Sequence, residues 1–226
     1  MKETILIREL WETMKSNRDL VAYIKSNVSF STRPSSFRII EAMGEVDRRD
    51  FLPPDSKQFA YYDEPVSIGY GQTCSQPSLV ALMLDKLSIR PGDRILEIGS
   101  GCGYAAAIAS KLCGQEGRVY ACEIIPELVS LMRANLEDRF PTVEIIEGDG
   151  SAGFAQLAPF DRILLSAGVD SSSFKREILL PQLASPGVLL YPEARGFLYR
   201  LNRNGANIEE QMYGYVSFVP LRGRNA

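Results

Sequence analysis

A glycine-rich loop beside an acidic residue is the first part of this sequence that could support chemistry. Gly99, Gly101 and Gly103 lie within ILEIGSGCGYAA, residues 95–106, between a strand-like run and a helix-like run. Glycine allows a positive φ and lets a ligand approach the backbone closely. In an open α/β sheet, nucleotide-like ligands bind at the carboxyl end of the strand that precedes such a loop. The loop, which also contains Ser100, is therefore a candidate cofactor site.

The spacing in this loop argues against a ligand held by its pyrophosphate. The position three residues after Gly101 is Tyr104, so the dinucleotide pattern G-x-G-x-x-G is absent, and no phosphate-binding G-x-x-x-x-G-K-[ST] motif occurs. Glu97 lies two residues before Gly99, where its carboxylate would repel a pyrophosphate. The same carboxylate would suit a ligand that carries a positively charged amino group.

Two further acidic residues follow later strand-like runs. Glu123 ends RVYACE and precedes Ile124, where a carboxylate can accept hydrogen bonds from ribose hydroxyls. Asp149 lies beside Gly150 in EGDG, where it could meet an adenine amino group. Each acid taken alone is also compatible with an ordinary charge at a strand end or in a turn. Together, acids at the ends of three successive strands predict a cationic, non-phosphorylated adenosine ligand, and S-adenosylmethionine has that chemistry.

Polar and reactive side chains also precede an apolar, helix-like segment in GYGQTCSQPSLVA, residues 69–81. Ser75 suits the N-cap of that helix, because Pro77 is favoured in a first helical turn. A helix N-terminus also favours an anion, so Ser75 could cap the helix and bind a ligand as well. Nothing beside Cys74 in the sequence marks it as a nucleophile, which favours a packing role for this thiol.

Composition narrows the classes of function. A chain of 226 residues with 45% hydrophobic and 23% charged residues is typical of one globular domain. The net charge is −3 and no basic stripe occurs, so a nucleic-acid partner is not expected. No apolar run of about 18 residues predicts a membrane helix, and MKETILIRELWETMK is too charged for a secretory signal. These features predict a cytoplasmic protein, which we also expect to be a monomer.

The sequence contains no histidine, which excludes every catalytic scheme that depends on an imidazole. Its four cysteines form no C-x-x-C pair, so free thiols are expected and a metal site is not. Any catalysis must therefore proceed without an imidazole.

Alternating strand-like and helix-like segments position these residues. Over residues 91–193 they predict a mostly parallel, Rossmann-like sheet with helices on both faces, including a helix over SFKREILLPQL. Residues 1–60 read as a helical addition, with helices over ILIRELWETM and SFRIIEAMGEV. Residues 194–226 contain two strand-like runs around Asn204 and Gly205, a strong hairpin signal, and predict antiparallel C-terminal strands. We expect a single domain over residues 1–226.

The motifs resemble those of the protein-L-isoaspartate (D-aspartate) O-methyltransferase family. AYYDEPVSIGYGQTCSQPSLVA is similar to the long family signature Y-x-D-x-P-x-x-I-G-x-G-Q-T-I-S-Q-P-x-x-V-A. EIGSGCGYAA, EGDGSAGFAQLAPFD and FVPLRG are similar to later family motifs, and the resemblance covers residues 37–221. It implies a class I methyltransferase fold with an N-terminal helical addition. The implied reaction is methyl esterification of the abnormal carboxylate of isoaspartyl residues, which starts repair of damaged peptides and proteins.

The resemblance implies that Ser75 is the active-site serine. Its hydroxyl could donate a hydrogen bond to the substrate carboxylate, with Thr73 and the backbone amides of residues 72–75 sharing this role. Gln72, Thr73, Cys74 and Ser75 are also expected to border the cofactor. Asp63 could bind a substrate amide or could simply form a turn before Pro65.

Three departures from the family pattern keep other functions open. Cys74 replaces the usual aliphatic residue, and residues 166–183 and 184–194 lack the usual small-residue run and paired glycines. The leading hypothesis is a repair methyltransferase for isoaspartyl sites. The second keeps the fold and cofactor but changes the protein or small-molecule acceptor. The third is a non-catalytic module that only binds the cofactor, against which the intact Gln72-Thr73 and Ser75 argue.

Overall fold

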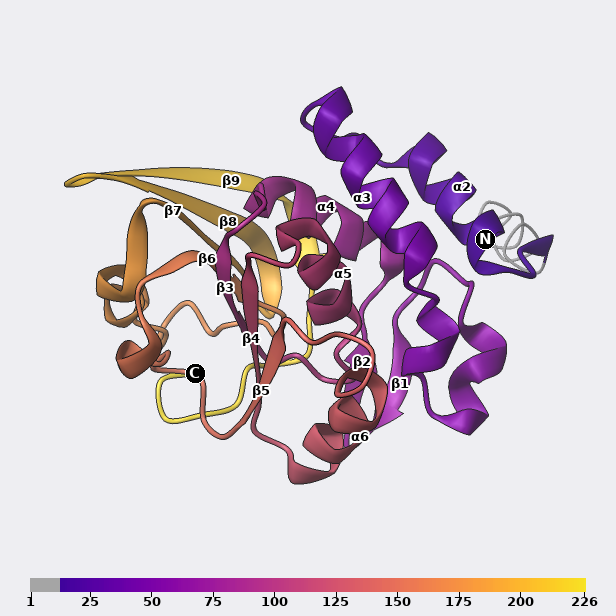
Figure 1. The fold of residues 1–226 in the computed structure, drawn as a ribbon. Coiled ribbons are helices and arrows are strands. Elements are labelled where there is room, and N and C mark those ends of the chain that lie inside the picture. Colours follow the sequence, from indigo (N-terminus) through magenta and orange to yellow (C-terminus); the bar gives the residue numbers. More distant parts are fainter. Residues whose placement is uncertain (1–12) are drawn as a thin grey trace.

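Seven strands form the central sheet in the computed structural model, which describes residues 13–226 (Figure 1). Their spatial order is β5-β4-β3-β6-β7-β8-β9, and all are parallel except β8 and β9, which are antiparallel to their neighbours. The bounds are β3 (Arg94–Ile98), β4 (Arg118–Glu123), β5 (Val143–Glu147), β6 (Phe160–Leu165), β7 (Leu183–Pro192), β8 (Arg195–Asn204) and β9 (Asn207–Ser217). The predicted Rossmann-like sheet with antiparallel C-terminal strands is confirmed.

Strand β3 lies at the point where the strand order reverses. The chain proceeds from β3 to β4 and β5 on one side, then returns to place β6 on the other side of β3. In open α/β sheets such a switch point leaves a crevice at the carboxyl ends of the strands, where ligands bind. Glu97, next to the last residue of β3, and Glu123, at the end of β4, both lie at this edge of the sheet.

Helices cover both faces of the sheet, as predicted, but those on one face are much shorter. The helices α4 (Pro77–Leu87), α5 (Tyr104–Cys113) and α6 (Pro126–Leu136) pack on the face that carries Ile95 and Val119. The opposite face, which carries Leu96 and Tyr120, is covered by the 3-10 helices η3 (Ala155–Leu157), η4 (Arg176–Ile178) and η5 (Leu180–Gln182). Neighbouring residues of each strand thus enter opposite cores, as the two-residue period of a strand requires.

The continuous helix predicted over SFKREILLPQL is wrong, because the structure has only η4 and η5 there. Pro181 lacks a backbone N–H and its ring blocks a regular α-helix. Gln182 is instead used as a buried connector. Its side chain accepts a hydrogen bond from Phe154 N at 2.7 Å and donates one to Ala152 O at 2.7 Å.

The N-terminal addition packs against the helices α4, α5 and α6 on one face of the sheet. It contains α2 (Asn17–Asn27), α3 (Arg33–Glu45), η1 (Arg48–Phe51) and η2 (Pro54–Phe59), and Figure 1 shows α3 beside α4 and α5. The helix predicted over SFRIIEAMGEV is confirmed but begins three residues earlier, at Arg33, because Thr32 caps it by accepting from Ser35 N. Asp85 of α4 accepts from Ser31 N and Ser35 Oγ, which ties the addition to α4. The helix predicted over ILIRELWETM falls almost wholly outside the described residues.

Two β-hairpins complete the fold. The predicted turn at Asn204 and Gly205 is confirmed, because it joins β8 to β9 and Gly205 has a φ of 64°. A smaller hairpin pairs β1 (Val66–Gly69) with β2 (Gln72–Cys74), and its turn holds Tyr70 at a φ of 56°. The smaller hairpin carries the polar run of residues 72–75 to the carboxyl edge of the sheet. Within residues 13–226, no helix has the length and apolar character needed to cross a bilayer.

Candidate active site

The glycine loop has the backbone shape that its sequence predicts. Gly99, Gly101 and Gly103 have φ values of 80°, 55° and 84°, which favour glycine. A Cβ at Gly99 would lie 3.2 Å from Ala167 Cβ, so the loop closely approaches the segment after β6. Gly103 differs from the other two, because it caps α5. Gly103 therefore shapes the loop without lining a cavity.

Glu123 holds the loop in place through its carboxylate. One oxygen accepts a hydrogen bond from Gly101 N at 2.9 Å, and the other accepts from Ile124 N at 2.8 Å and Ile125 N at 3.0 Å. The side chain is buried and its residue lines a cavity. Since a carboxylate has about four acceptor positions, Glu123 can anchor the loop and still accept a hydroxyl donor.

Glu97 is the most unusual acid in the site. It is 1% exposed, its Oε1 accepts a hydrogen bond from Ser166 Oγ at 2.6 Å, and its Oε2 has no partner among the described residues. Burial raises the pKa of Glu97 to about 7, although the Ser166 hydrogen bond opposes the shift. A buried carboxylate oxygen without a donor is costly. A cationic amino group in this cavity would satisfy it, so the donor set fits the predicted ligand.

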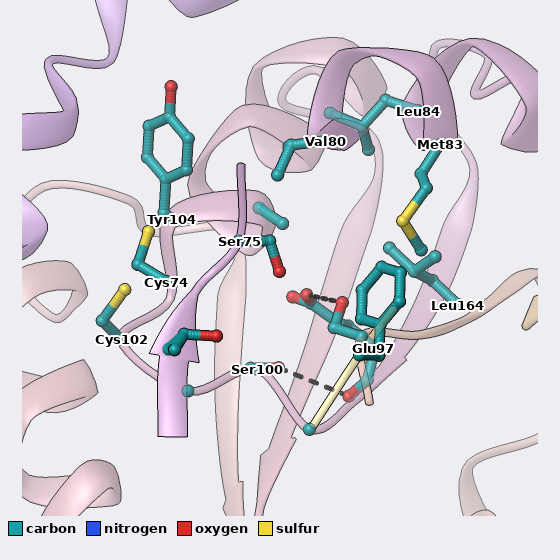
Figure 2. A pocket seen from close by; sticks show the side chains of 16 residues that line it. Cys74, Ser75, Val80, Met83, Leu84, Glu97, Ser100, Cys102, Tyr104 and Leu164 are labelled. Carbon is teal, nitrogen blue, oxygen red and sulfur yellow. Dashed lines mark hydrogen bonds between the residues drawn. The ribbon is translucent and has the colours of Figure 1, made fainter. Parts of the chain in front are cut away.

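The cavity around Glu97 is mainly apolar apart from the groups that converge on it. Figure 2 shows the Glu97 carboxylate and the Ser75 hydroxyl directed into the same space, with Val80, Met83 and Leu164 around them. We call this space the donor cavity, and its lining also includes Thr73, Cys74, Gly99, Ser100 and Gly101. An apolar cavity with a few polar groups is the usual form of a small-molecule site.

A second cavity adjoins the donor cavity on the side of Glu123. Seven of the residues that the sequence predicted for the cofactor site line this cavity, namely Gln72, Thr73, Gly99, Gly101, Glu123, Ile124 and Gly150. Thr73 and Ser166 line both cavities. Each has a volume of about 40 Å³, which is room for only a few waters. A ligand that occupies both must therefore widen them as it binds.

Asp149, like Gly103, is a predicted cofactor residue that the structure does not bring to either cavity. Its carboxylate accepts hydrogen bonds from Ser151 N at 2.9 Å and from Arg224 N at 2.9 Å. Partial burial tends to raise the pKa of Asp149, but these hydrogen bonds have the larger combined effect. The pKa of Asp149 is therefore lowered overall. Asp149 therefore holds the C-terminal segment near the Glu123 cavity in this structure.

The N-cap interpretation of Ser75 is wrong, because the N-cap position of α4 is occupied by Gln76. The helix is capped instead by Asp63, a buried residue whose carboxylate accepts from Ser78 N at 2.8 Å and Gln76 Nε2 at 3.0 Å. This capping role differs from the turn before Pro65 that was considered for Asp63, and because Asp63 also lines the large groove beside Ser75, its role toward a substrate stays a prediction. Ser75 is thereby left free of capping and lines the donor cavity.

Cys74 is a buried free thiol in the donor cavity, as is Cys102. A hydrogen bond from Cys102 is the largest cause that lowers the pKa of Cys74, and the nearby Arg48 charge adds to it. Both thiols lie within the apolar core. The packing role predicted for Cys74 fits this burial.

An open groove meets the donor cavity at Ser75. The groove has a volume of about 670 Å³ and shares Thr73, Ser75 and Phe218 with the donor cavity. One wall consists of consecutive residues of β9 and the segment after it, residues 213–219. The other wall includes Tyr23 and Asn27 of α2 and Leu79 and Leu82 of α4. Ser75 therefore lies at the boundary between the small donor cavity and a much larger groove.

Two residues of the site were not found from the sequence. Ser166 directly follows β6 and binds Glu97, a position that the order of strands could have indicated. Arg48 lies in the charged run DRRD, which gives no sign of burial, yet it is 0% exposed. Among residues 13–226, no group of acidic or thiol side chains could hold a metal ion.

Comparison with known sequences identifies a family with the same motifs. The family model described as protein-L-isoaspartate(D-aspartate) O-methyltransferase matches residues 15–226. A protein-L-isoaspartate O-methyltransferase from Methanothrix thermoacetophila is 41% identical, covering 84% of this chain and 90% of the relative. A relative of the same name from Methanopyrus kandleri is 39% identical, covering 95% of this chain and 90% of the relative. Another, from Methylorubrum populi, is 44% identical, covering 81% of this chain and 85% of the relative.

Solved structures support the same assignment. A protein-L-isoaspartate O-methyltransferase structure has a TM-score of 0.80 and 25% identity, covering 92% of this chain and 67% of that one. A putative enzyme of this name from Plasmodium falciparum, solved with S-adenosyl-L-homocysteine, has a TM-score of 0.79 and 24% identity, over 92% and 99%. Because the family model spans residues 15–226 and the sequence relatives are similar over most of their length, this chain belongs to the protein-L-isoaspartate(D-aspartate) O-methyltransferase family.

Proposed function

We propose that the protein transfers the methyl group of S-adenosylmethionine to the free carboxylate of L-isoaspartyl residues, and of D-aspartyl residues, in damaged peptides and proteins. One observation supports this most strongly. Ser75 lies where the donor cavity, with its unpaired Glu97 oxygen, opens into a groove of about 670 Å³. A methyl donor on one side and a peptide on the other would therefore meet at Ser75.

The donor would be held by residues from both cavities. Glu97 would bind its amino group, Glu123 its ribose hydroxyls, and the loop of Gly99, Ser100 and Gly101 would border it. Gln72, Thr73, Cys74, Ile124 and Gly150 complete the lining, while the role of Asp149 toward adenine stays a prediction. When bound, S-adenosylmethionine supplies a methyl group activated by its attachment to a sulfonium.

The acceptor needs orientation rather than activation. A free carboxylate of this kind has a pKa of about 4 or below and is already ionised at neutral pH, so no base is required. This agrees with a chain that contains no histidine. Ser75 would donate a hydrogen bond to one oxygen of this carboxylate and so direct the other toward the methyl group. Correct orientation can contribute about 7–11 kcal/mol to lowering a barrier.

The apolar lining of the donor cavity would add to this effect by excluding water. Val80, Met83, Leu84 and Leu164 border the cavity and carry no polar side-chain atoms that could hold a solvent layer. Charged reactants interact more strongly where water is absent. Ser75, at the boundary with the groove, would be the point at which the acceptor carboxylate loses its water shell.

The groove suits a peptide in an extended conformation. Among the described strands, β9 is the last in the sheet order. One edge of its backbone is therefore not paired with another strand and could pair with a bound peptide. Main-chain pairing is largely independent of side-chain identity. This would suit an enzyme whose damaged sites occur in many sequences. Tyr23 and Asn27 of α2 would contact residues that flank the damaged site, which gives the N-terminal addition a part in substrate binding.

An altered acceptor is the second candidate function. It is favoured by residues 166–194, where the helix expected from the sequence is replaced by η4 and η5. The fold and methyl donor would then be unchanged, and a different protein or a small molecule would accept the methyl group. We further propose that the protein acts as a monomer in the cytoplasm. All four thiols are unpaired, as is usual in a reducing compartment.

A paired-peptide assay tests these candidates. The protein is incubated with methyl-labelled S-adenosylmethionine and an isoaspartyl peptide, its aspartyl twin or its D-aspartyl twin. We expect label in the isoaspartyl peptide as a base-labile ester, little in the aspartyl twin and a weaker signal in the D-aspartyl peptide. Equal labelling of the isoaspartyl and aspartyl peptides contradicts the proposal. Cofactor binding without any peptide labelling favours the altered acceptor.

A further inference from the structure

A buried arginine of the N-terminal addition binds the backbone of the segment that carries Ser75. Arg48 begins η1 and is 0% exposed, yet no carboxylate pairs with it among residues 13–226. Its guanidinium donates instead to five backbone carbonyl oxygens at 2.9–3.2 Å, namely those of Ala60, Tyr62, Glu64, Cys74 and Ser75. Both terminal nitrogens are used in this arrangement, whereas Nε has no partner among residues 13–226.

The five carbonyls belong to two segments that both border the site. Residues 60–64 form the loop before β1, and Cys74 and Ser75 lie at the end of β2 and just beyond it. Nη2 alone binds Glu64 O, Cys74 O and Ser75 O, so one nitrogen joins the two segments. The backbone on both sides of the Cys74–Ser75 peptide bond is therefore fixed by Arg48.

The same loop also fixes the residues that follow Ser75. Asp63, between two of the carbonyls bound by Arg48, accepts hydrogen bonds from Gln76 Nε2 and Ser78 N. Ser75 is thus held at its own carbonyl by Arg48 and at the start of α4 by Asp63. With both sides fixed, the orientation of the Ser75 hydroxyl toward the donor cavity depends on this frame.

The chemistry of the side chain supports a role beyond packing. Burying a cation away from water is costly unless its donors are satisfied, and apolar residues of similar volume often stabilise a fold as well or better. Only the planar fork of arginine can reach several carbonyls at fixed angles, whereas lysine offers a single nitrogen. The fork is directed at the backbone of the residue that meets the acceptor.

We propose that Arg48 is a positioning residue for methyl transfer, which acts through Ser75 and does not touch the substrate. This inference rests on the proposed role of Ser75. Arg48 sets the position of the Ser75 backbone, and through it the direction of the hydroxyl that binds the acceptor carboxylate. Cofactor binding depends chiefly on Glu97 and Glu123, and none of the hydrogen bonds of Arg48 goes to either residue.

The test compares Arg48→Lys with the parent protein and with a matched control, Arg162→Lys. Arg162 is another buried arginine, which binds Ser88 O at 3.1 Å and pairs with Asp93 at 3.1 Å, at the opposite edge of the sheet. Measured quantities are kcat and KM for an isoaspartyl peptide, Kd for S-adenosylhomocysteine and Tm. We expect Arg48→Lys to lower kcat/KM by about 30-fold or more and to leave Kd within about threefold. Arg162→Lys should lower Tm but keep kcat/KM within about threefold.

A double-mutant cycle separates positioning from general loss of structure. If Arg48 acts through Ser75, adding Arg48→Lys to Ser75→Ala should reduce kcat/KM by less than about threefold further. Multiplicative effects of the two changes would overturn the proposal, as would an Arg48→Lys variant with normal kcat/KM. An inactive parent protein would instead refute the proposed function, so the two failures are distinguishable.

A second variant covers the case in which Arg48→Lys does not fold. Arg48→Gln is then assayed with millimolar guanidinium chloride, because the free cation can occupy the position of the missing group. Recovery of both folding and turnover supports the proposal. Recovery of folding alone, or no folded protein in either case, assigns Arg48 to stability and overturns the positioning role. Circular dichroism reports folding in each experiment.

Discussion

Ser166 donates a hydrogen bond of 2.6 Å to Glu97 Oε1, while Glu97 Oε2 lies in the donor cavity without a partner. The two residues come from neighbouring parallel strands, β3 and the end of β6. One half of the carboxylate is thus fixed by the protein, and the other half is available to a ligand. This arrangement explains how a buried acid can be oriented without being neutralised by an arginine or lysine.

Replacing Glu97 by glutamine should weaken cofactor binding. The amide keeps the shape of the side chain but loses the charge that would attract the amino group. Because a hydrogen bond to a charged group is worth about 1.5–3 kcal/mol, we expect Kd for S-adenosylhomocysteine to rise about 10- to 100-fold at pH 8. Isothermal calorimetry measures it. Glu144→Gln, an exposed acid on β5, is the control and should leave Kd unchanged. An unchanged Kd in Glu97→Gln would remove Glu97 from the cofactor site.

Cofactor affinity should depend on pH through the same residue. Burial raises the pKa of Glu97 to about 7, so below that pH a cation that binds the carboxylate must displace a proton. Affinity for S-adenosylhomocysteine should therefore rise about fivefold to tenfold between about pH 6 and 7.5, with proton release below about pH 7. Calorimetry in two buffers of different ionisation enthalpy measures the release. Glu97→Gln should abolish both effects, and a flat parent profile would contradict the prediction.

The ligand-free protein should also lose stability as the pH rises through this range. The folded state binds the Glu97 proton more tightly than the unfolded state, whose carboxyl has its ordinary pKa of 4.5. The sign of this contribution is therefore a fall in the free energy of unfolding from about pH 4.5 to about pH 7, and no further change above. Urea unfolding of the parent and Glu97→Gln proteins measures the difference, which should shrink as the pH falls from about 7 to about 4.5 and stay constant below that. A parent protein that gains stability relative to Glu97→Gln as the pH rises would contradict it.

Replacing Ser75 by alanine should impair turnover but not cofactor binding. Its hydroxyl is the donor expected to bind the acceptor carboxylate, so we expect kcat to fall about 10²-fold. Kd for S-adenosylhomocysteine should stay within about threefold. The control is Ser130→Ala, an exposed hydroxyl on α6 that donates to Pro126 O. Normal turnover in Ser75→Ala would show that the hydroxyl has no catalytic role.

Replacing Asp63 by alanine should destabilise the protein, because this carboxylate caps α4. Loss of a cap costs about 0.5–2 kcal/mol, and the free energy of unfolding in urea should fall by that amount. Asp55→Ala, an exposed acid in η2, serves as the control. If Asp63→Ala kept its stability and only raised KM for the peptide, Asp63 would be a substrate ligand instead.

Replacing Cys74 by alanine should have little effect on catalysis. The thiol is buried in the core and is not placed to attack an acceptor, so kcat should stay within about threefold. The lost packing should lower the free energy of unfolding by about 1 kcal/mol. Cys113→Ala, another buried thiol, is the control. A loss of turnover near 10²-fold would give Cys74 a direct part in the reaction.

Much of the sheet and cofactor site could be predicted from sequence, because both depend on local pattern. The alternation of strands and helices, the turn at Asn204 and Gly205, and the glycine loop after β3 are properties of consecutive residues. Glu97 and Glu123 follow as well, since the ends of parallel strands meet at one edge of a sheet. The failure over SFKREILLPQL has a local cause too, because Pro181 interrupts the helix that the other residues favour.

The frame around Ser75 was decided by tertiary structure alone. Asp63 caps a helix that begins many residues later, and Arg48 reaches the carbonyl of Ser75 from η1. Such contacts depend on which backbone groups lack a hydrogen-bond partner after the helices and strands have packed. The pattern of neighbouring residues in the sequence does not indicate which groups these are. A charged run like DRRD looks exposed in sequence, yet the fold buries Arg48 because it offers five carbonyls in one place. The sequence alone thus determined the sheet and its cofactor edge, and packing decided how the acceptor side is held.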